Sequence, residues 1–369
     1  MPDSWCRIAD EEAVSSPALL VFPERIRENL RRMVAIAGGP GRLRPHVKTH
    51  KMPQVVRLAL EQGIRAFKAA TIAEAEMAAA AGARDVLLAY PAVGPTPARL
   101  AALARMFPST TFRAVADSPA GVAAVAAAAR AAAIDIDVLV DLNVGMDRTG
   151  IPPGAEACSL YRAIAETPGL VAGGLHAYDG HLHDADAARL EAAVEAAFAP
   201  VWRLRDELLG AGLSVPRVVA SGTPTFRILA RRPEVELGAG TPVLWDAGQA
   251  VVCPDLEFLP AAVLLTRVVS RPAADRLCLD VGHKAVASEM PHPRLVLLGL
   301  EDAVFVGHNE EHLVIQTPRA AAHPVGTVVY AIPRHVCPTV NLHAEALAVV
   351  AGRVVDRWPV AARARRISI

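Results

Sequence analysis

The first 221 residues alternate short runs of β-branched or otherwise apolar residues with longer segments rich in alanine. Eight short runs predict β-strands: Ala18–Phe22, Leu43–Val47, Ala66–Thr71, Asp85–Tyr90, Phe112–Asp117, Asp137–Leu142, Gly173–Tyr178 and Arg217–Ser221. The segments between them consist of good helix formers and predict helices at Glu24–Ala37, Pro53–Gln62, Ala73–Ala81, Pro97–Arg105, Ala120–Ala133, Ala155–Glu166 and Ala185–Leu209. Glycines such as Gly38 and Gly63 follow several of these helices as typical stop signals.

This alternation predicts an α/β fold, a (β/α)8 TIM barrel. A doubly wound open sheet is the alternative, but no glycine-rich dinucleotide fingerprint follows the first predicted strand. Beyond residue 245 the pattern changes to strand-like runs, at Ala261–Ser270, Leu277–Val281, Arg294–Leu298, Glu311–Gln316, Thr327–Ile332 and Ala346–Val350. We therefore expect a barrel over residues 17–245 and a mostly antiparallel β domain made of residues 1–16 and 246–369.

Composition narrows the class of function. The chain has 38 basic and 38 acidic residues, so it lacks the basic excess typical of proteins that bind nucleic acid or a membrane surface. No run of about 20 apolar residues predicts a membrane span, and the N-terminal residues do not resemble a signal peptide. The five cysteines are scattered, which fits a reducing compartment. We expect a cytoplasmic protein that recognises a small molecule in a pocket.

The segment RPHVKTHK (Arg44–Lys51) places a lysine at the end of a predicted barrel strand, where the active sites of such barrels lie. Alternation along an extended strand would put His46, Lys48 and His50 on one face. A buried lysine is costly unless its amine is neutralised, and a Schiff base with an aldehyde cofactor neutralises it. The alternative is a solvated basic loop.

Three further strand ends carry candidate binding groups. In ASGTPTF, small residues let backbone N–H groups approach a phosphate, and Ser221 and Thr223 flank Gly222 as hydroxyl donors. Arg148, in GMDRTG, is suited to an anionic oxygen. In GLHAYDGHLHD, Tyr178 is placed to face a cofactor ring, and His181 or His183 to act as a general base. Each pattern taken alone also fits an ordinary glycine turn, a surface arginine or surface histidines.

A second candidate site lies in the predicted β domain. His335 and Cys337 are two residues apart, so on a strand their side chains would point the same way. Imidazole and thiolate are zinc-type ligands, and two protein ligands leave positions open for water and substrate. The alternative is a chance spacing that involves a buried cysteine.

These segments together resemble the fold-type III pyridoxal-phosphate enzymes, and among them the D-threonine aldolase / D-serine dehydratase family. The resemblance rests on RPHVKTHK, GMDRTG, GLHAYDGH, ASGTPTF and HVCPTVN, with LDVGHKAVASE and ELGAGTPVLWDAG as further shared segments, all in the family's order. It implies an alanine-racemase-like barrel with a β domain, usually as a homodimer. It also implies that Lys48 forms the Schiff base with pyridoxal 5'-phosphate and that Arg148 contacts its phenolic oxygen.

By the same resemblance, Ser221, Gly222 and Thr223 hold the cofactor's phosphate. The expected contacts with the cofactor also include His46, Tyr178, Gly240 and Thr241. His335 and Cys337 would bind a divalent metal beside the substrate's β-hydroxyl. The sequence departs from the family at Pro242, where relatives often carry tyrosine, so a phosphate contact is missing or is replaced, for example by Trp245.

The implied activity is that of a lyase on D-3-hydroxy-α-amino acids. Cys337 stands where aldolases tend to carry an acidic ligand, so it favours dehydration, and it favours zinc over manganese or magnesium. The histidines of GLHAYDGHLHD also permit aldol cleavage. A metal-independent racemase and a non-catalytic cofactor carrier are the alternatives. The lyase hypothesis requires Lys48 and the pair His335 and Cys337 to converge on one pocket.

Overall fold

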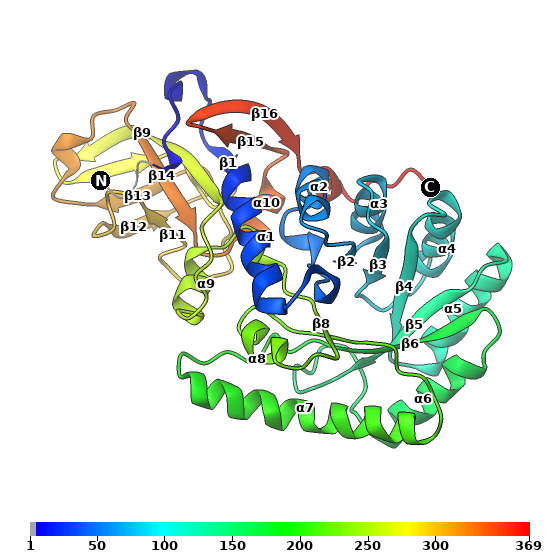
Figure 1. The fold of residues 1–369 in the computed structure, drawn as a ribbon. Helices are drawn as coiled ribbons and strands as arrows, with labels where there is room; N and C mark the ends of the chain where they lie inside the picture. The colour runs from blue at the N-terminus through cyan, green and yellow to red at the C-terminus, as the bar shows by residue number, and fades with distance from the viewer. Residues whose placement is uncertain (1–4) are drawn as a thin grey trace. The chain divides into compact units, whose positions relative to one another are not determined.

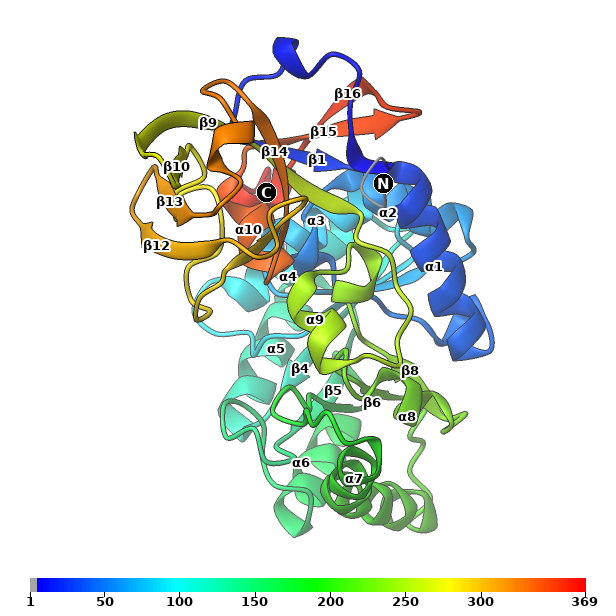
Figure 2. The same ribbon diagram turned by 90° about the vertical axis from the view of Figure 1, so that its left-hand side faces the viewer.

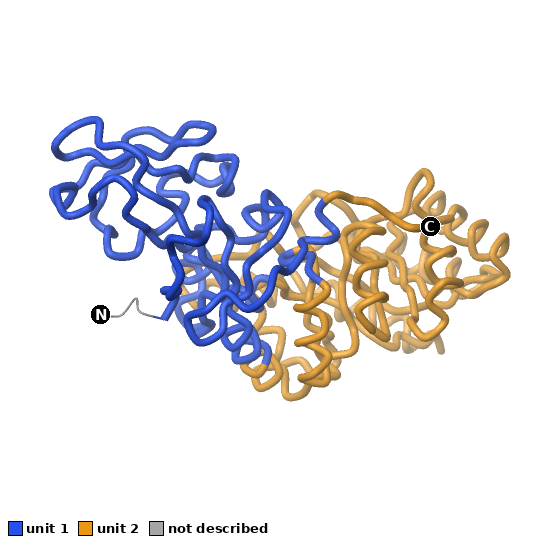
Figure 3. The backbone as a smooth tube through the Cα atoms, turned by 90° about the horizontal axis from the view of Figure 1, so that it is seen from above, with its two compact units in different colours: residues 1–30, 49–52, 241–363 blue, residues 31–48, 53–240, 364–369 orange. Residues whose placement is uncertain are grey.

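The computed structural model describes residues 5–369, and these form two compact units (Figure 3). Unit 1 comprises the described residues up to 30, residues 49–52 and residues 241–363. Unit 2 comprises residues 31–48, 53–240 and 364–369. These ranges differ from the sequence-based expectation chiefly in residues 17–30, which belong to unit 1.

Unit 2 is built around a parallel sheet whose strands follow their order in the chain. They are β2 (Ala66–Ala69), β3 (Asp85–Leu88), β4 (Thr111–Ala116), β5 (Ile136–Leu142), β6 (Leu170–Ala177), β7 (Val218–Ala220) and β8 (Val235–Leu237). The helices are α2 (Pro53–Glu61), α3 (Ile72–Ala80), α4 (Thr96–Met106), α5 (Pro119–Ala132), α6 (Ala155–Glu166), α7 (Ala187–Gly210) and α8 (Phe226–Ala230). The helices α3 to α6 cover the outer face of the sheet (Figure 1).

Residues 43–46, here called the first stave, close this sheet into a barrel. Leu43 forms a parallel bridge with Leu237 of β8, and His46 forms one with Lys68 of β2. The N–H of Arg44 donates to the carbonyl of Leu237 at 2.9 Å, and the N–H of Lys68 donates to the carbonyl of Pro45 at 3.0 Å. The first stave and β2–β8 therefore make eight staves, and the predicted (β/α)8 barrel is confirmed.

Two strand assignments made from the sequence are wrong. Ala18–Phe22 is not the first barrel strand, because β1 (Ala18–Val21) pairs with β9 (Ala262–Ala273) and β15 (Glu345–Val350) in unit 1. The eighth stave is β8, which the sequence analysis missed, since VEL is too short to form an alternating run. The predicted strand Arg217–Ser221 therefore corresponds to the seventh stave.

Six charged side chains form a closed ring inside one end of the barrel. Each arginine contacts two carboxylates, in the pairs Arg44–Asp85, Asp85–Arg113, Arg113–Asp137, Asp137–Arg217, Arg217–Glu236 and Glu236–Arg44. The Arg44 guanidinium is buried, with N–O distances of 2.5 Å to Asp85 and 2.7 Å to Glu236. Gly173 leaves room for the ring, because a Cβ at this position would lie 1.7 Å from a carboxylate oxygen of Asp137.

The side chains above this ring follow the two-residue repeat of the strands. Two positions after Asp85, Arg113, Asp137 and Arg217 stand Leu87, Val115, Leu139 and Val219, which form one buried apolar cluster. Two positions further on stand Ala89, Asp117, Asp141 and Ser221. The carboxyl ends of the strands therefore carry polar groups above an apolar layer that separates them from the charge ring.

Unit 1 contains the β domain. Its sheet runs in the order β12–β13–β10–β9–β1–β15–β16 (Figure 2), and β14 pairs with both β9 and β11. The remaining strands are β10 (Arg276–Leu279), β11 (Leu295–Leu297), β12 (Val304–His308), β13 (Leu313–Gln316), β14 (Val328–Pro333) and β16 (Arg353–Pro359). All of these pairings are antiparallel except β1 with β15, which agrees with the predicted domain type.

Several elements of unit 1 were not predicted from the sequence. They are the strands β12 and β16 and the short helices α9 (Ala247–Val252) and α10 (Val336–Leu342). The helix α1 (Pro23–Ala37) begins in unit 1 and ends in unit 2. Within residues 5–369, no helix combines the length and the apolarity that crossing a membrane requires.

The charge ring yields a prediction about stability. Arg113→Met removes the cation between Asp85 and Asp137 and leaves two partly buried carboxylates short of a partner. Breaking a buried ion pair in this way costs about 3–5 kcal/mol, so we expect a clear loss of unfolding free energy in urea titrations followed by circular dichroism. The matched control is Arg189→Met, because Arg189 pairs with Asp184 at the surface and should change little. Equal stability of both variants would contradict a structural role of the ring.

Candidate active site

Lys48 lies at the mouth of the barrel, directly after the first stave. Val47–Thr49 form a 3-10 helix, so the expected alternation of His46, Lys48 and His50 on one strand face is wrong. The N–H of Lys48 donates to Nδ1 of the buried His46 at 3.3 Å. His50 belongs to unit 1, and burial lowers the pKa of its imidazole to about 3. Of the three residues, His46 and Lys48 therefore remain candidates for the barrel site.

Three cationic groups surround the ring of Tyr178, which follows β6. The distances to the ring centre are 5.7 Å from Lys48 Nζ, 5.8 Å from Lys68 Nζ and 4.8 Å from the Arg148 guanidinium carbon. Cations over an aromatic face are attracted by its negative potential, but they also repel one another. The mouth of the barrel therefore favours an anionic ligand beside Tyr178.

Lys68 is the member of this group that the sequence analysis did not single out. It lies on the inner face of β2, and only 2% of its surface is exposed. Gly238 makes room for it, since a Cβ there would lie 2.2 Å from Nζ. Burial, together with the charge of Lys48, lowers the pKa of Lys68 to about 7, with Asp179 acting in the opposite direction. The sequence signal that could have identified Lys68 is a lysine on the inward face of a short predicted strand.

Ser221, Gly222 and Thr223 form a buried turn after β7, as the sequence predicts for a phosphate loop. Ser221 has a φ of 84°, which is strained for a residue with a side chain. Asp179 holds the turn, because its carboxylate accepts from the Gly222 N–H at 2.5 Å and from the Thr225 hydroxyl at 2.6 Å. Asp179 is fully buried, and burial raises its pKa.

His176, on β6, presents a buried ring nitrogen. Its Nδ1 lies 2.7 Å from a carboxylate oxygen of Asp141 on the neighbouring strand β5. Its Nε2 is buried and has no hydrogen-bond partner among residues 5–369. Buried polar nitrogens are rarely left unpaired, so this atom marks a place where a ligand would complete the site.

The two candidate bases differ in their surroundings. His181 is half-buried, its Nδ1 finds no partner in the described part of the chain, and its Nε2 packs against Gly145. His183 is exposed, and its Nδ1 lies 3.0 Å from the carbonyl oxygen of His181. His181 therefore has a buried ring nitrogen without a described partner, whereas His183 faces solvent, and the assignment of the base to one of them stays a prediction.

His335 and Cys337 lie in unit 1 at the start of α10, not on a strand as expected. Their side chains nevertheless lie close enough for each to shift the pKa of the other. His335 Nδ1 lies 2.5 Å from a carboxylate oxygen of Glu289, and Cys337 Sγ lies 3.3 Å from the Thr49 hydroxyl and 3.6 Å from the Thr241 hydroxyl. Thr241, expected to contact the cofactor, therefore places its hydroxyl beside the thiol.

Burial and their mutual contact shift the pKa values of His335 and Cys337. Burial alone would lower the pKa of His335, but the contacts with Cys337 and Glu289 raise it above its usual value. Burial would raise the pKa of Cys337, whereas the neighbouring imidazole lowers it. Within residues 5–369, no cluster of three or more His, Cys, Asp and Glu side chains is arranged to hold a metal. The pair therefore offers two ligands, which suits an ion that is also bound by water or substrate.

Other predicted features lie elsewhere. Trp245, considered as a substitute for the missing tyrosine, is buried against Phe258.

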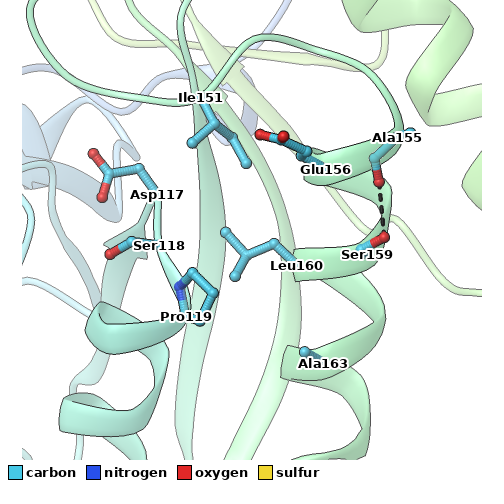
Figure 4. A pocket seen from close by; sticks show the side chains of 9 residues that line it. All are labelled: Asp117, Ser118, Pro119, Ile151, Ala155, Glu156, Ser159, Leu160 and Ala163. Atoms are coloured by element: carbon cyan, nitrogen blue, oxygen red, sulfur yellow. Dashed lines mark hydrogen bonds between the residues drawn. The ribbon is translucent and has the colours of Figure 1, made fainter.

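A pocket of 540 Å³ opens in unit 2 between the end of β4 and the helix α6 (Figure 4). Asp117 and Glu156 line it together with Ile151 and Leu160. None of the residues predicted from the sequence to bind cofactor, substrate or metal lines this pocket.

Comparison with protein families identifies the type of barrel. A family model described as the N-terminal domain of alanine racemase matches residues 21–240, which is more than half of the chain. A model described as a putative serine dehydratase domain matches residues 261–349. The chain is thus an alanine-racemase-type barrel protein with a serine-dehydratase-type β domain.

Individual relatives narrow this class. A D-threonine aldolase from an Arthrobacter species is 31% identical over 362 residues, which cover 95% of this chain and 93% of the relative. The chain belongs to the D-threonine aldolase / D-serine dehydratase family of alanine-racemase-like proteins.

Two solved structures agree with this assignment. The crystal structure of D-threonine aldolase from Filomicrobium marinum superimposes with a TM-score of 0.88 at 28% identity and covers 98% of this chain and 99% of that one. A D-threo-3-hydroxyaspartate dehydratase, described as a cysteine-to-alanine variant in the metal-free form, superimposes with a TM-score of 0.80. It is 26% identical, and the match covers 95% of this chain and 98% of that one.

The bonds of Asp179 lead to a prediction about the turn at Ser221–Thr223. Asp179→Ala leaves the Gly222 N–H without an acceptor and leaves the Thr225 hydroxyl only the distant Gly222 carbonyl, at 3.4 Å. An unsatisfied buried group costs about 1–3 kcal/mol. We expect faster amide hydrogen exchange at Gly222 and at least about tenfold weaker binding of pyridoxal phosphate. The matched control is Asp179→Asn, whose amide oxygen still accepts one hydrogen bond. Its exchange rate and its affinity for the cofactor should lie between those of Asp179→Ala and those of the parent. Unchanged exchange in Asp179→Ala would show that the turn does not depend on this carboxylate.

Proposed function

We propose that the protein is a lyase that uses pyridoxal 5'-phosphate and a divalent metal to cleave D-3-hydroxy-α-amino acids. The observation that carries the proposal is the proximity of the His335 imidazole and the Cys337 thiol at the start of α10, in a chain whose barrel gathers Lys48, Lys68 and Arg148 around Tyr178. A racemase of the same barrel type needs no metal, so this pair favours a lyase. The relatives named as aldolase and dehydratase support the same conclusion.

The residues of the barrel mouth fit an anionic aromatic aldehyde. Lys48 would bind it covalently, Arg148 would contact its phenolic oxygen, and the turn at Ser221–Thr223 would hold its phosphate. The unpartnered Nε2 of His176 and the cations around Tyr178 leave hydrogen-bonding capacity and positive charge for such a group. When bound, pyridoxal phosphate supplies the electron sink for breaking a bond at the substrate's α-carbon.

The pair in unit 1 fits a borderline-soft divalent ion. Sulfur and imidazole nitrogen favour zinc, with manganese and magnesium as weaker candidates. The ion would polarise the substrate's β-hydroxyl. The chain itself joins the two groups, because Thr49 and Thr241, whose hydroxyls contact Cys337, directly follow Lys48 and Gly240 in the sequence. That both groups act on one substrate molecule is part of our proposal, because the lyase reaction requires it.

Aldol cleavage is the reaction that we propose first. His181 has a buried ring nitrogen without a described partner, and it would accept the proton of the substrate's β-hydroxyl while the Cα–Cβ bond breaks. D-Threonine would then give glycine and acetaldehyde. Dehydration is the second candidate, because Cys337 provides a thiolate where aldolases tend to carry an acidic ligand. In that reaction Lys48 would take the α-proton, and D-serine would give pyruvate and ammonia.

The homodimer implied by the resemblance and the cytoplasmic location remain proposals. The five cysteines are free thiols in the structure, which is compatible with a reducing compartment. Sedimentation of the purified protein would settle its oligomeric state.

The identity of the cofactor lysine is directly testable. In Lys48→Ala the visible absorbance of the bound cofactor should disappear, because the carbonyl has lost its amine partner. Lys51→Ala is the matched control: this neighbouring lysine should be replaceable without loss of the band. A band that survives in Lys48→Ala but vanishes in Lys51→Ala or Lys68→Met would assign the cofactor to another amine.

Product analysis distinguishes the two reactions. The chelator-treated protein, reloaded with pyridoxal phosphate, is incubated with D-threonine and D-serine, with and without zinc. We expect zinc-dependent release of glycine and acetaldehyde from D-threonine. Pyruvate and ammonia from D-serine would instead select dehydration, and metal-independent formation of the L-enantiomer would select the racemase alternative. No change in either substrate would contradict the proposed lyase.

A further inference from the structure

Glu289 stands at the end of LDVGHKAVASE, a segment for which the proposed chemistry has no use so far. Its carboxylate oxygen lies 2.5 Å from Nδ1 of His335, although the two residues are 46 positions apart in the chain. A carboxylate only accepts hydrogen bonds. Nδ1 of His335 therefore carries the proton in this contact, and the lone pair available for a metal is on Nε2.

The loop that carries Glu289 is tied to the helix that carries His335. The Thr339 hydroxyl, one turn into α10, accepts from the N–H of Ala287 at 3.1 Å and donates to the carbonyl of His335 at 2.8 Å. At the end of α10, Nε2 of His343 lies 2.8 Å from the carbonyl oxygen of Ala285. One side chain thus connects the backbone of His335 with the residue two positions before Glu289, which fixes where the carboxylate meets the imidazole.

Charge supports the same arrangement. A neutral imidazole and a thiolate would leave a divalent ion with one uncompensated positive charge. The Glu289 carboxylate supplies the missing negative charge without occupying a coordination position, because it contacts the opposite nitrogen of the ring. Carboxylates that hydrogen-bond to metal-bound histidines commonly orient the ring and raise its basicity in this way.

We propose that Glu289 is a positioning residue that holds His335 with Nε2 free for the metal and strengthens its binding. This inference rests on the metal site proposed above. A purely structural role, in which Glu289 only anchors its loop to α10, would affect the stability of the metal-free protein instead of its affinity for zinc.

The experiment is a zinc titration of the chelator-stripped full-length protein in competition with a chromophoric chelator. Glu289→Ala should bind zinc about 10–100-fold more weakly than the parent. Glu289→Gln should show an intermediate loss, because its amide oxygen still accepts from Nδ1 but carries no charge. The matched control is Glu345→Gln, which removes a carboxylate on β15 that pairs with Arg357 and should leave the affinity unchanged.

Thermal unfolding with and without zinc provides the second readout. We expect the metal-free Glu289→Ala protein to unfold near the parent's midpoint temperature. Added zinc should raise this midpoint less than it raises the parent's. A lowered midpoint of the metal-free protein with unchanged zinc affinity would overturn the inference in favour of the structural role.

The variant His335→Ala distinguishes a failure of the proposed metal site from a failure of the proposed role of Glu289. If His335→Ala abolishes zinc binding but Glu289→Ala binds like the parent, the inference about Glu289 fails and the proposed metal site stands. If His335→Ala leaves zinc affinity unchanged, the proposed metal site fails, and the inference fails with it.

Discussion

The closed ring of arginines and carboxylates at one end of the barrel is the constraint on which unit 2 depends. Its members come from six of the eight staves, so each ion pair also fixes the register of one stave against another. A one-residue slip of any of these strands would turn a charge into the outer layer of the barrel. The ring therefore determines which side chains point inward two and four residues further on.

The polar mouth of the barrel is the outcome of this register. An apolar layer of Leu87, Val115, Leu139 and Val219 separates the ring from the ends of the strands. Beyond that layer, the same strands present Asp141 and Ser221, and the neighbouring strands β2 and β6 contribute the buried Lys68 and His176. Charges and an unpaired nitrogen in such a place are costly in the absence of a ligand.

Unit 1 positions the imidazole of His335 and the thiol of Cys337 with few residues. The short helix α10 begins at His335, so the imidazole and the thiol two residues later meet across the first turn. Three side chains from segments distant in sequence contact these two groups within unit 1: Glu289, Thr49 and Thr241. A site with only two protein ligands can still bind a metal specifically, because the hydrogen-bond partners of the ligands fix which atoms face the metal.

The sequence by itself determined the alternation of strands and helices, the barrel class and the positions of the chemical groups, because hydrophobic period and turn residues are local signals. Only the tertiary structure decided that Ala18–Val21 pairs in unit 1, that β8 and the first stave close the barrel, and that Lys68 and Lys48 both approach the ring of Tyr178. It also decided that His335 and Cys337 meet on a helix and that Glu289 reaches His335. Strand pairing and contacts across 46 or more residues depend on which surfaces are buried together, and no local pattern encodes that.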